Sequence, residues 1–385
     1  MHIAIVCRGL GAGGSVAAVA LRQARELTRH ARVTVISDSL PEELHGLEAI
    51  KVRVPDFHAL RRLRHVPDEV AFARAARIAL QKLAGAGPIG PIGPISPIGP
   101  ISPTPPTFIL AHSHSVAYLA ARKVGVPCGF FVHGDITDRP TGMYDSRLTK
   151  FYQWVTPRAY RTADVVFVLA PYFVDIAKRG GAKRVELVPN GIDPSEIGLD
   201  PQPPTANRQP PTGPLRVLTV GRLSIEKGIP QLVDAVTSLG DAVTLTVVGE
   251  GPLEPLVRGR ANFLGRQPRA TLGAIYRQHD VFCSAALSET FGLVIAEALV
   301  SGLPVVATRV GGIPLLVEHG HNGLLVPPGD TRALADALAT LARDEALRAR
   351  LAENARPSVL PRFAWPAIGD RLAGIMGEII RTMRA

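Results

Sequence analysis

Two glutamates in the second half of the chain have the spacing of a pair of ligand-binding carboxylates. Glu289 and Glu297 stand eight positions apart in SETFGLVIAEALVSG, where Gly292 ends a turn and the residues after it follow a helical pattern. We expect Glu289 in the loop and Glu297 in the second helical turn, so that both can point into one cleft. A carboxylate among apolar neighbours needs a partner, and sugar hydroxyls are suitable donors. The alternative for Glu297 is an exposed helical position.

Two cations stand near the start of the same half. Arg222 and Lys227 lie in TVGRLSIEKG, which has the pattern of a strand, a turn and a helix start. Arg offers a planar fork, Lys a point charge, and the helix dipole adds to both, which suits a diphosphate. The spacing is not that of a Walker A loop. The alternative is a solvated pair of surface charges.

A glycine-rich turn follows the first apolar run. In CRGLGAGGS, Gly9, Gly11 and Gly14 match G-x-G-x-x-G, and Asp38 lies near the distance at which a dinucleotide fold places its ribose-binding acid. An NAD-linked oxidoreductase is therefore one alternative. Glycines that serve only a tight turn are another.

The histidines and cysteines give no sign of a metal site. His112 and His114 alternate in AHSHS without carboxylate or cysteine companions, so cleft-lining or core positions are favoured over metal ligands. The three cysteines, Cys7, Cys128 and Cys283, lie in apolar strand-like runs and are expected to be reduced core residues.

These residues are positioned by alternating strands and helices. Short apolar runs such as HIAIVC and RVTVIS flank SVAAVALRQARELTRH, and the alternation restarts after a proline-rich break with LRVLTVG and TLTVVG. The pattern predicts two doubly wound parallel-sheet domains with ligands at the carboxyl ends of their strands. We expect a first domain over 1–200, a linker over 201–214, a second domain over 215–365, and a last helix over 366–385.

A triplet repeat, GPIGPIGPISPIGPISP, forms most of a proline-rich insert over 87–107. Ser96 and Ser102 replace the glycine that collagen requires, and the run is short, so a polyproline-like surface insert is the better interpretation. It enters at the amino end of the strand FILAHS, and we expect no catalytic role for it.

Composition narrows the partners. The formal charge of +10 and a pI near 9.9 favour anionic partners, while only 5% aromatic residues and no basic segment interleaved with aromatics argue against nucleic acid. No signal peptide pattern or apolar run of roughly 20 residues is present, which predicts a cytoplasmic protein. The basic stretch over 58–84 can approach an anionic membrane at its inner face, although a solvated basic helix is the simpler interpretation.

The motifs together resemble those of a known family. The spacing E-x7-E, with FG after the first Glu and SGLPVVATRVGGIPLLVEHGHNGLLVPPGD beyond the second, is similar to the retaining glycosyltransferases of family 4. Their GT-B architecture has two Rossmann-like domains facing across a cleft. The resemblance implies that residues 1–200 form the acceptor-side domain, that residues 215–365 form the nucleotide-sugar-binding domain, and that the helix over 366–385 crosses back to the first domain. The resemblance extends in family order to GGS at 13–15, VHGD at 132–135, VPNGID at 188–193, GRLSIEKG at 221–228, VVGEGP at 247–252 and RFAW at 362–365.

The resemblance implies roles for individual residues. Glu297 would hold the ribose hydroxyls of a nucleotide-sugar donor, and Glu289 would contact the transferred sugar. Arg222 and Lys227 would bind the diphosphate, and His133 would sit beside the sugar. Further donor contacts would come from the glycine-rich turn and from backbone amides near the second helix start, at Gly13, Gly14, Ser15, Phe291, Gly292 and Leu293.

The resemblance also implies a reaction. No D-x-D sequence is present for a divalent metal, so Arg222, Lys227 and the helix dipole would stabilise the departing nucleoside diphosphate without metal or cofactor. UDP- and GDP-linked hexoses are both compatible, and the acceptor can be lipid-linked, a saccharide or a small molecule. A GT-B nucleotide-sugar epimerase and a binding protein without turnover are the remaining alternatives.

Overall fold

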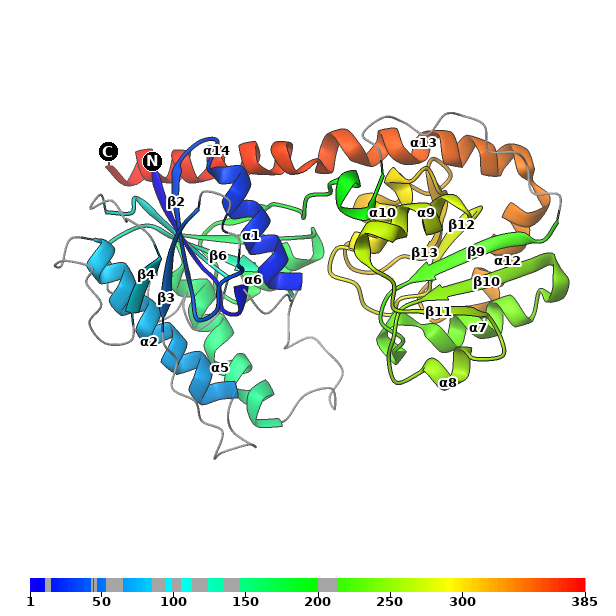
Figure 1. The fold of residues 1–385 in the computed structure, drawn as a ribbon, viewed down its shortest axis with the longest axis horizontal. Coiled ribbons are helices and arrows are strands. Elements are labelled where there is room, and N and C mark those ends of the chain that lie inside the picture. Colours follow the sequence, from blue (N-terminus) through cyan, green and yellow to red (C-terminus); the bar gives the residue numbers. More distant parts are fainter. Residues whose placement is uncertain are drawn as a thin grey trace. The chain divides into compact units, whose positions relative to one another are not determined.

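The computed structural model forms two compact units (Figure 1). One unit comprises Met1–Pro189 and Trp365–Ala385, and the other comprises Asn190–Ala364. The structure describes residues 1–10, 15–42, 44, 47–52, 65–84, 95–98, 105–112, 124–134, 146–199 and 213–384.

The first unit is built on one sheet whose strands run in the order β4-β3-β2-β1-β5-β6-β7-β8. All its pairs are parallel except β3 with β4, which are antiparallel. The strands are β1 (His2–Val6), β2 (Arg32–Ser37), β3 (Glu48–Val52), β4 (Ile95–Ile98), β5 (Phe108–Ala111), β6 (Cys128–Val132), β7 (Val165–Val168) and β8 (Val185–Leu187). Its helices are α1 (Ser15–Leu27), α2 (His65–Leu83), α5 (Ser146–Thr162), α6 (Tyr172–Arg179) and α14 (Trp365–Arg384).

Both faces of this sheet are buried, as the continuous apolar strands predict. Along β1, Ile3 and Ile5 pack with α1 and α14, whereas Ala4 and Val6 pack with α2 and α6 on the other face. Figure 1 shows α14 lying beside α1 on the same side of the sheet. The last helix of the chain is therefore part of the core of the first unit.

Helix α14 offers a direct test of this packing. Met376 is fully buried in the core beside α1, whereas Met383, two turns later, is mostly exposed. We expect Met376→Ala to lower the free energy of unfolding by about 2–5 kcal/mol, because it leaves a cavity in a packed core. Met383→Ala should leave it unchanged within about 0.5 kcal/mol. Chemical denaturation followed by circular dichroism measures both, and equal losses would contradict the assignment of α14 to this core.

The proline-rich insert contributes one strand. Within it, Ile95–Ile98 forms β4, which pairs antiparallel with β3 so that Pro97 lies opposite Ile50. An edge strand tolerates proline because one side of it needs no ladder hydrogen bonds. This short piece is thus sheet rather than polyproline helix, and residues 85–94 and 99–104 of the insert lie outside the described residues.

Helix α2 contains most of the basic stretch over 58–84, which could approach a membrane. Its apolar residues, among them Phe72, Ala76 and Leu80, are buried in the core of the first unit. The apolar face of α2 is therefore occupied by the protein itself. Among the helices of the described ranges, none combines the length and the apolar character needed to span a bilayer.

The second unit has a parallel sheet with the order β11-β10-β9-β12-β13-β14. Numbered within the unit this order is 3-2-1-4-5-6, the arrangement of dinucleotide-binding Rossmann folds. The strands are β9 (Leu215–Val220), β10 (Val243–Val248), β11 (Asn262–Gly265), β12 (Val281–Ser284), β13 (Val305–Thr308) and β14 (Gly323–Val326). Two α/β sheets, parallel except for the β3–β4 pair, confirm the fold class.

Helices cover both faces of this sheet as well. On β9, Leu218 packs toward α10 and α13, and Val217 packs toward α7 and α12. The helices are η3 (Pro194–Ile197), η4 (Ile225–Lys227), α7 (Ile229–Thr237), η5 (Gly240–Ala242), α8 (Glu254–Val257), η6 (Arg269–Thr271), α9 (Leu272–Arg277), α10 (Leu293–Val300), α11 (Ile313–Leu316), α12 (Thr331–Arg343) and α13 (Glu345–Phe363), where η denotes a 3-10 helix.

The boundary between the units differs from the expected one. Residues from Asn190 onward belong to the second unit, because Ile197 and Leu199 are buried in its core beside Tyr276. Most of the expected linker, residues 201–212, lies outside the described residues. The two ends of the second unit meet: Ile192 pairs with Ala364 in an isolated parallel bridge, and its N–H donates to the Phe363 carbonyl at 2.7 Å.

Candidate active site

The candidate site of the second unit lies where the strand order reverses. Strands β9 and β12 are neighbours, but the chain continues from each to opposite sides of the sheet. The loops that leave their carboxyl ends therefore diverge and leave room for a ligand. Arg222 and Lys227 follow β9, and Glu289 follows β12, so the fold brings together side chains that are more than 60 residues apart.

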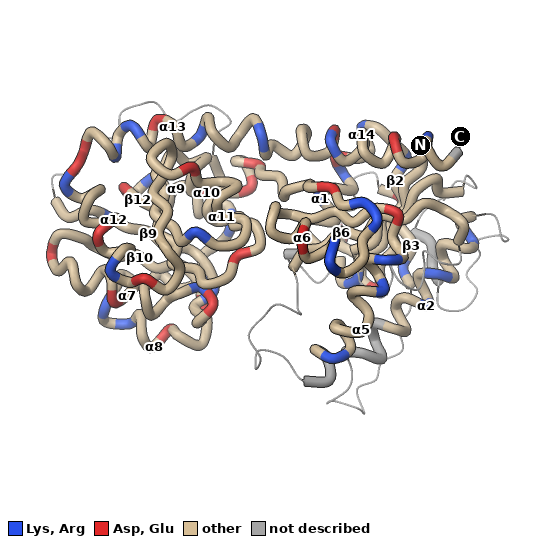
Figure 2. The backbone as a smooth tube through the Cα atoms, turned by 180° about the vertical axis from the view of Figure 1, so that it is seen from behind, with Lys and Arg blue, Asp and Glu red and all other residues tan. Residues whose placement is uncertain are grey.

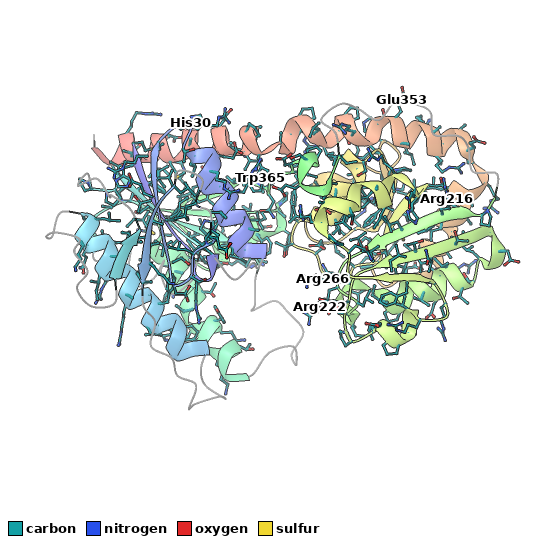
Figure 3. The ribbon with its side chains drawn as sticks, viewed as in Figure 1. His30, Arg216, Arg222, Arg266, Glu353 and Trp365 are labelled. Atoms are coloured by element: carbon teal, nitrogen blue, oxygen red, sulfur yellow. The ribbon has the colours of Figure 1, made fainter. Side chains whose placement is uncertain are left out.

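The two loops meet in an ion pair. Lys227 Nζ donates to Glu289 Oε2 at 2.7 Å, and the other oxygen, Oε1, accepts from the Thr290 N–H at 3.0 Å. The Glu289 side chain is mostly buried, while that of Lys227 is one-third exposed. Arg222 is exposed at the same edge of the sheet, as Figure 3 shows. The predicted positions of Glu289 in a loop and of Lys227 before a helix start are confirmed.

Backbone contacts hold these loops against each other. The N–H of Leu287 donates to the Glu226 carbonyl at 2.9 Å, which joins the loops after β12 and β9. The Gly312 N–H, in the loop after β13, donates to the Glu289 carbonyl at 3.1 Å and supports the same segment from another side. Gly228 has a left-handed φ of 65°, and a Cβ at this position would stand 1.8 Å from the Ala285 carbonyl oxygen. Only glycine permits this approach, which fixes Lys227 relative to the loop of Glu289.

Helix α10 begins beside this ion pair. Its N-cap, Gly292, has a φ of 95°, and Ile295 and Ala296 donate to its carbonyl. Among the described residues, no acceptor is found for the amide N–H groups of Phe291, Gly292 and Leu293. Amides at a helix start suit an anion or a hydroxyl oxygen.

Glu297 lies in the second turn of α10, as predicted, but it is buried and not exposed. Its Oε2 accepts from the Tyr276 hydroxyl at 3.1 Å, and its Oε1 lies 2.8 Å from Nη2 of Arg269. Burial raises the pKa of the Glu297 carboxyl, while Arg269 and the Tyr276 hydroxyl act in the opposite direction. Burial and the charge on Glu297 hold the pKa of Tyr276 well above its usual range, so this hydroxyl remains a donor.

The two glutamates of the E-x7-E motif therefore have separate partners. Glu289 pairs with the loop after β9, and Glu297 pairs with residues that the sequence did not single out, Arg269 of η6 and Tyr276 of α9. Arg269 and Tyr276 stand seven residues apart, about two helical turns, which places them on one side of this segment. That spacing was a signal, but a weak one without knowledge of the buried carboxylate.

In the first unit, His133 follows β6 and contacts His112, which follows β5. The His112 Nδ1 and His133 Nε2 atoms are 2.8 Å apart, and the His112 ring is stacked on Phe131. Burial, and then the nearby His133, lower the pKa of His112 well below its usual range, so this ring is neutral. His112 is thus a buried partner of His133, and His114 lies outside the described residues.

The glycine-rich turn is described only in part. Gly11, Gly13, Gly14 and the side chain of Ser15 lie outside the described residues. Asp38 closes the turn itself: its Oδ1 accepts from the Gly9 N–H at 2.7 Å and its Oδ2 from Arg8 Nε at 3.3 Å. A dinucleotide ribose would have to displace these contacts, so the NAD alternative is not favoured.

Charges in the second unit are mixed. Figure 2 shows basic and acidic positions interspersed along its backbone. Within the described ranges, no group of three or more His, Cys, Asp or Glu residues is placed to hold a metal ion.

Family models match both units. The model for glycosyl transferases group 1 matches residues 205–358, and the model for glycosyltransferase family 4 matches residues 12–196. Alpha-D-kanosaminyltransferase from Streptomyces kanamyceticus is 29% identical over 283 residues, which are 68% of this chain and 73% of that enzyme. The chain spans less than half the length of the next three curated relatives that it matches.

Solved structures share the two-domain fold over the whole chain. Sucrose-phosphate synthase from Thermosynechococcus elongatus has a TM-score of 0.77 at 21% identity and covers 99% of both chains. HepE from Anabaena, in complex with UDP-glucose, has a TM-score of 0.70 at 20% identity and covers 98% of this chain and all of that one. Two Rossmann-like units with this motif order, matched in succession by two models, show that the chain belongs to the group 1 glycosyltransferases.

Proposed function

We propose that the protein is a retaining, metal-independent glycosyltransferase that moves a hexose-type sugar from a UDP- or GDP-linked donor to an acceptor in glycan, glycolipid or cell-envelope biosynthesis. The contact between Lys227 and Glu289 at the strand-order reversal carries this proposal. A cation for the diphosphate and a carboxylate for the sugar lie side by side there, as the adjoining parts of a nucleotide sugar do. Relatives named for glycosyl transfer and a neighbour that binds UDP-glucose support the same donor class.

In this proposal the donor lies across the β9 and β12 loops. Lys227 and Arg222 bind the diphosphate, Glu289 and the amides of Phe291, Gly292 and Leu293 bind the sugar, and Glu297 accepts from the ribose hydroxyls. Gly13, Gly14 and Ser15 contribute to the diphosphate site, and His133 contacts the sugar. The first unit binds the acceptor, which provides a hydroxyl group and is lipid-linked, a saccharide or a small molecule.

The reaction requires no protein base. The acceptor oxygen forms a bond to the anomeric carbon on the face that the diphosphate leaves, so the configuration is retained. The bond from that carbon to the phosphate oxygen breaks, and the acceptor proton passes to a phosphate oxygen of the departing nucleoside diphosphate. Fixed cations stabilise the charge that develops on the leaving group, which takes the part a metal would otherwise play.

Donor-only turnover tests the proposal. Purified protein is incubated with UDP-, GDP- and ADP-sugars in EDTA, and release of nucleoside diphosphate is followed. We expect slow hydrolysis of one donor and its loss in Glu289→Ala, because the sugar contact is removed. Glu353→Ala, an exposed carboxylate on α13 (Figure 3), is the matched control and should retain full activity.

Two results would contradict the proposal. If no sugar nucleotide of the panel binds and no nucleoside diphosphate is released, a nucleotide-sugar donor is excluded. Tight binding of NAD(H) would instead favour the oxidoreductase alternative. Release that disappears in EDTA and returns with a divalent cation would leave the glycosyltransferase class intact but reject metal independence.

A further inference from the structure

Arg269 lies between two carboxylates at the edge of the second unit's core. Its Nη2 atom donates to Glu196 Oε2 at 3.1 Å and stands 2.8 Å from Glu297 Oε1. The Arg269 side chain is 48% exposed, whereas that of Glu297 is 2% exposed. An exposed cation thus covers a carboxylate that the core otherwise encloses.

The two oxygens of Glu297 differ in how they are used. Oε2 accepts a hydrogen bond from Tyr276, whereas Oε1 is buried and has the Arg269 guanidinium 2.8 Å away as an ion-pair partner, outside strict hydrogen-bond geometry. A buried carboxylate oxygen with an unused acceptor position is costly unless something donates to it. Oε1 therefore keeps acceptor capacity beneath the Arg269 guanidinium, and a ligand hydroxyl reaches it once that exposed side chain shifts.

Three ionisable groups face Glu297, and their effects have different signs. Burial raises its pKa, Arg269 and Tyr276 lower it, and Glu196 raises it. Arg269 is the one cation within ion-pair distance of this carboxylate among the described residues. Without Arg269 the carboxyl would take up a proton at a higher pH, and a neutral carboxyl accepts hydrogen bonds more weakly.

We propose that Arg269 is a positioning residue for the nucleoside end of the donor, which holds the Glu297 carboxylate in place to accept a ribose hydroxyl. This inference rests on the proposed function, in which Glu297 binds the ribose. Glu196 binds the guanidinium from the other side and keeps Arg269 close to Glu297 when the guanidinium shifts for a ligand.

Titration calorimetry with UDP and GDP, and with their 2′-deoxy analogues, tests the inference. We expect Arg269→Gln to bind the preferred nucleoside diphosphate about tenfold more weakly near pH 6.5, with a smaller deficit near about pH 8.5, because a higher pH favours the ionised form of Glu297. Arg269→Lys should restore most of the affinity at both pH values, because it keeps the charge. The affinity of each variant is divided by that of the wild type at the same pH, which removes the titration of the nucleotide itself.

Arg216 provides a matched control. Its side chain is 49% exposed and is paired at 2.7 Å with Asp280, whose side chain is 6% exposed, but it lies at the opposite end of β9 from Arg222 (Figure 3). Arg216→Gln removes the same kind of pair away from the site. It should leave the affinity ratio constant with pH, even if it lowers stability. An equal pH dependence in both variants, or a loss in Arg269→Gln that does not change with pH, would overturn the inference.

The ribose analogues separate this inference from the proposed function. We expect the wild type to bind the ribonucleotide at least about tenfold more tightly than the 2′-deoxy analogue, and Glu297→Gln to abolish that preference. If the wild type shows no preference or binds neither nucleotide, the donor role of Glu297 fails, and the role of Arg269 fails with it. If the preference depends on Glu297 but survives in Arg269→Gln at every pH, only the role of Arg269 is overturned.

Discussion

Lys227→Met is expected to lower the rate of donor turnover by about two to three orders of magnitude, the usual cost of removing one fixed group that stabilises developing charge. Methionine keeps much of the length of the side chain but removes the charge that lies 2.7 Å from Glu289. Since the diphosphate gains negative charge only as it departs, the loss should fall mainly on kcat and less on the donor KM. Both constants are measured from release of nucleoside diphosphate.

Two further variants show whether the charge acts on the donor or only on Glu289. Lys227→Met combined with Glu289→Gln forms a double-mutant cycle; full recovery of activity in the double variant would mean that Lys227 serves only to neutralise Glu289. Lys178→Met, an exposed position on α6 of the first unit, controls for the loss of a lysine as such. A threefold change in rate corresponds to about 0.7 kcal/mol in activation free energy. If Lys227→Met turns over the donor within threefold of the wild-type rate, Lys227 does not stabilise the transition state.

Gly228→Ala is expected to lower the free energy of unfolding by about 2–4 kcal/mol and to abolish turnover. The added Cβ would stand 1.8 Å from the Ala285 carbonyl oxygen, and backbone atoms cannot move aside as a flexible side chain can. The loop after β9 must therefore shift away from the loop after β12, which separates Lys227 from Glu289. Thermal unfolding and donor release on the same preparation measure the two effects.

Gly240→Ala separates steric conflict from backbone strain. Gly240 also has a left-handed φ, 55°, but a Cβ there would meet no atom within 4 Å. This variant should lose only the conformational cost of about 1–2 kcal/mol and keep its activity. If Gly228→Ala is no more destabilised than Gly240→Ala, the close approach of the two loops is not a structural requirement.

Much of the site was predictable because the strand order follows from local patterns. Alternating apolar runs and helical segments imply parallel sheets, and parallel sheets put the loops that follow their strands at one edge. Arg222, Lys227 and Glu289 could therefore be assigned to a common edge before any distance was known. The turn at Gly292 likewise predicted that the helix carrying Glu297 starts after Glu289, as α10 does.

The partners of Glu297 could not be predicted in the same way. Whether a helical glutamate is exposed or buried depends on which face of its helix meets the rest of the core, and α10 is apolar on nearly all sides. Arg269 reaches it from a separate 3-10 turn, so their contact is a property of tertiary packing. The contact of His112 with His133 has the same origin, since it requires β5 and β6 to be neighbours.

The boundary predicted from the sequence, after residue 200, differs from the observed start of the second unit at Asn190 for a related reason. Proline-rich composition marks a break in regular structure, but it does not mark where one core ends. The short helix at Pro194–Ile197 precedes that break and yet buries Ile197 fully in the second core. Burial of a few apolar side chains therefore outweighed a composition signal that lay farther along the chain.

The second unit is one continuous segment of the chain, and the bridge between Ile192 and Ala364 holds its two ends together. Ile192, near the start of the second unit, lies beside Ala364, its last residue. The second unit is therefore an insertion between β8 and α14 of the first unit, and the two ends of this insertion already meet. A few glycines could join those ends, which would allow a circular permutant of the second unit to be made with new termini at an exposed turn. Because its ends meet, the second unit could also be replaced by the equivalent unit of another protein without changing either segment of the first unit.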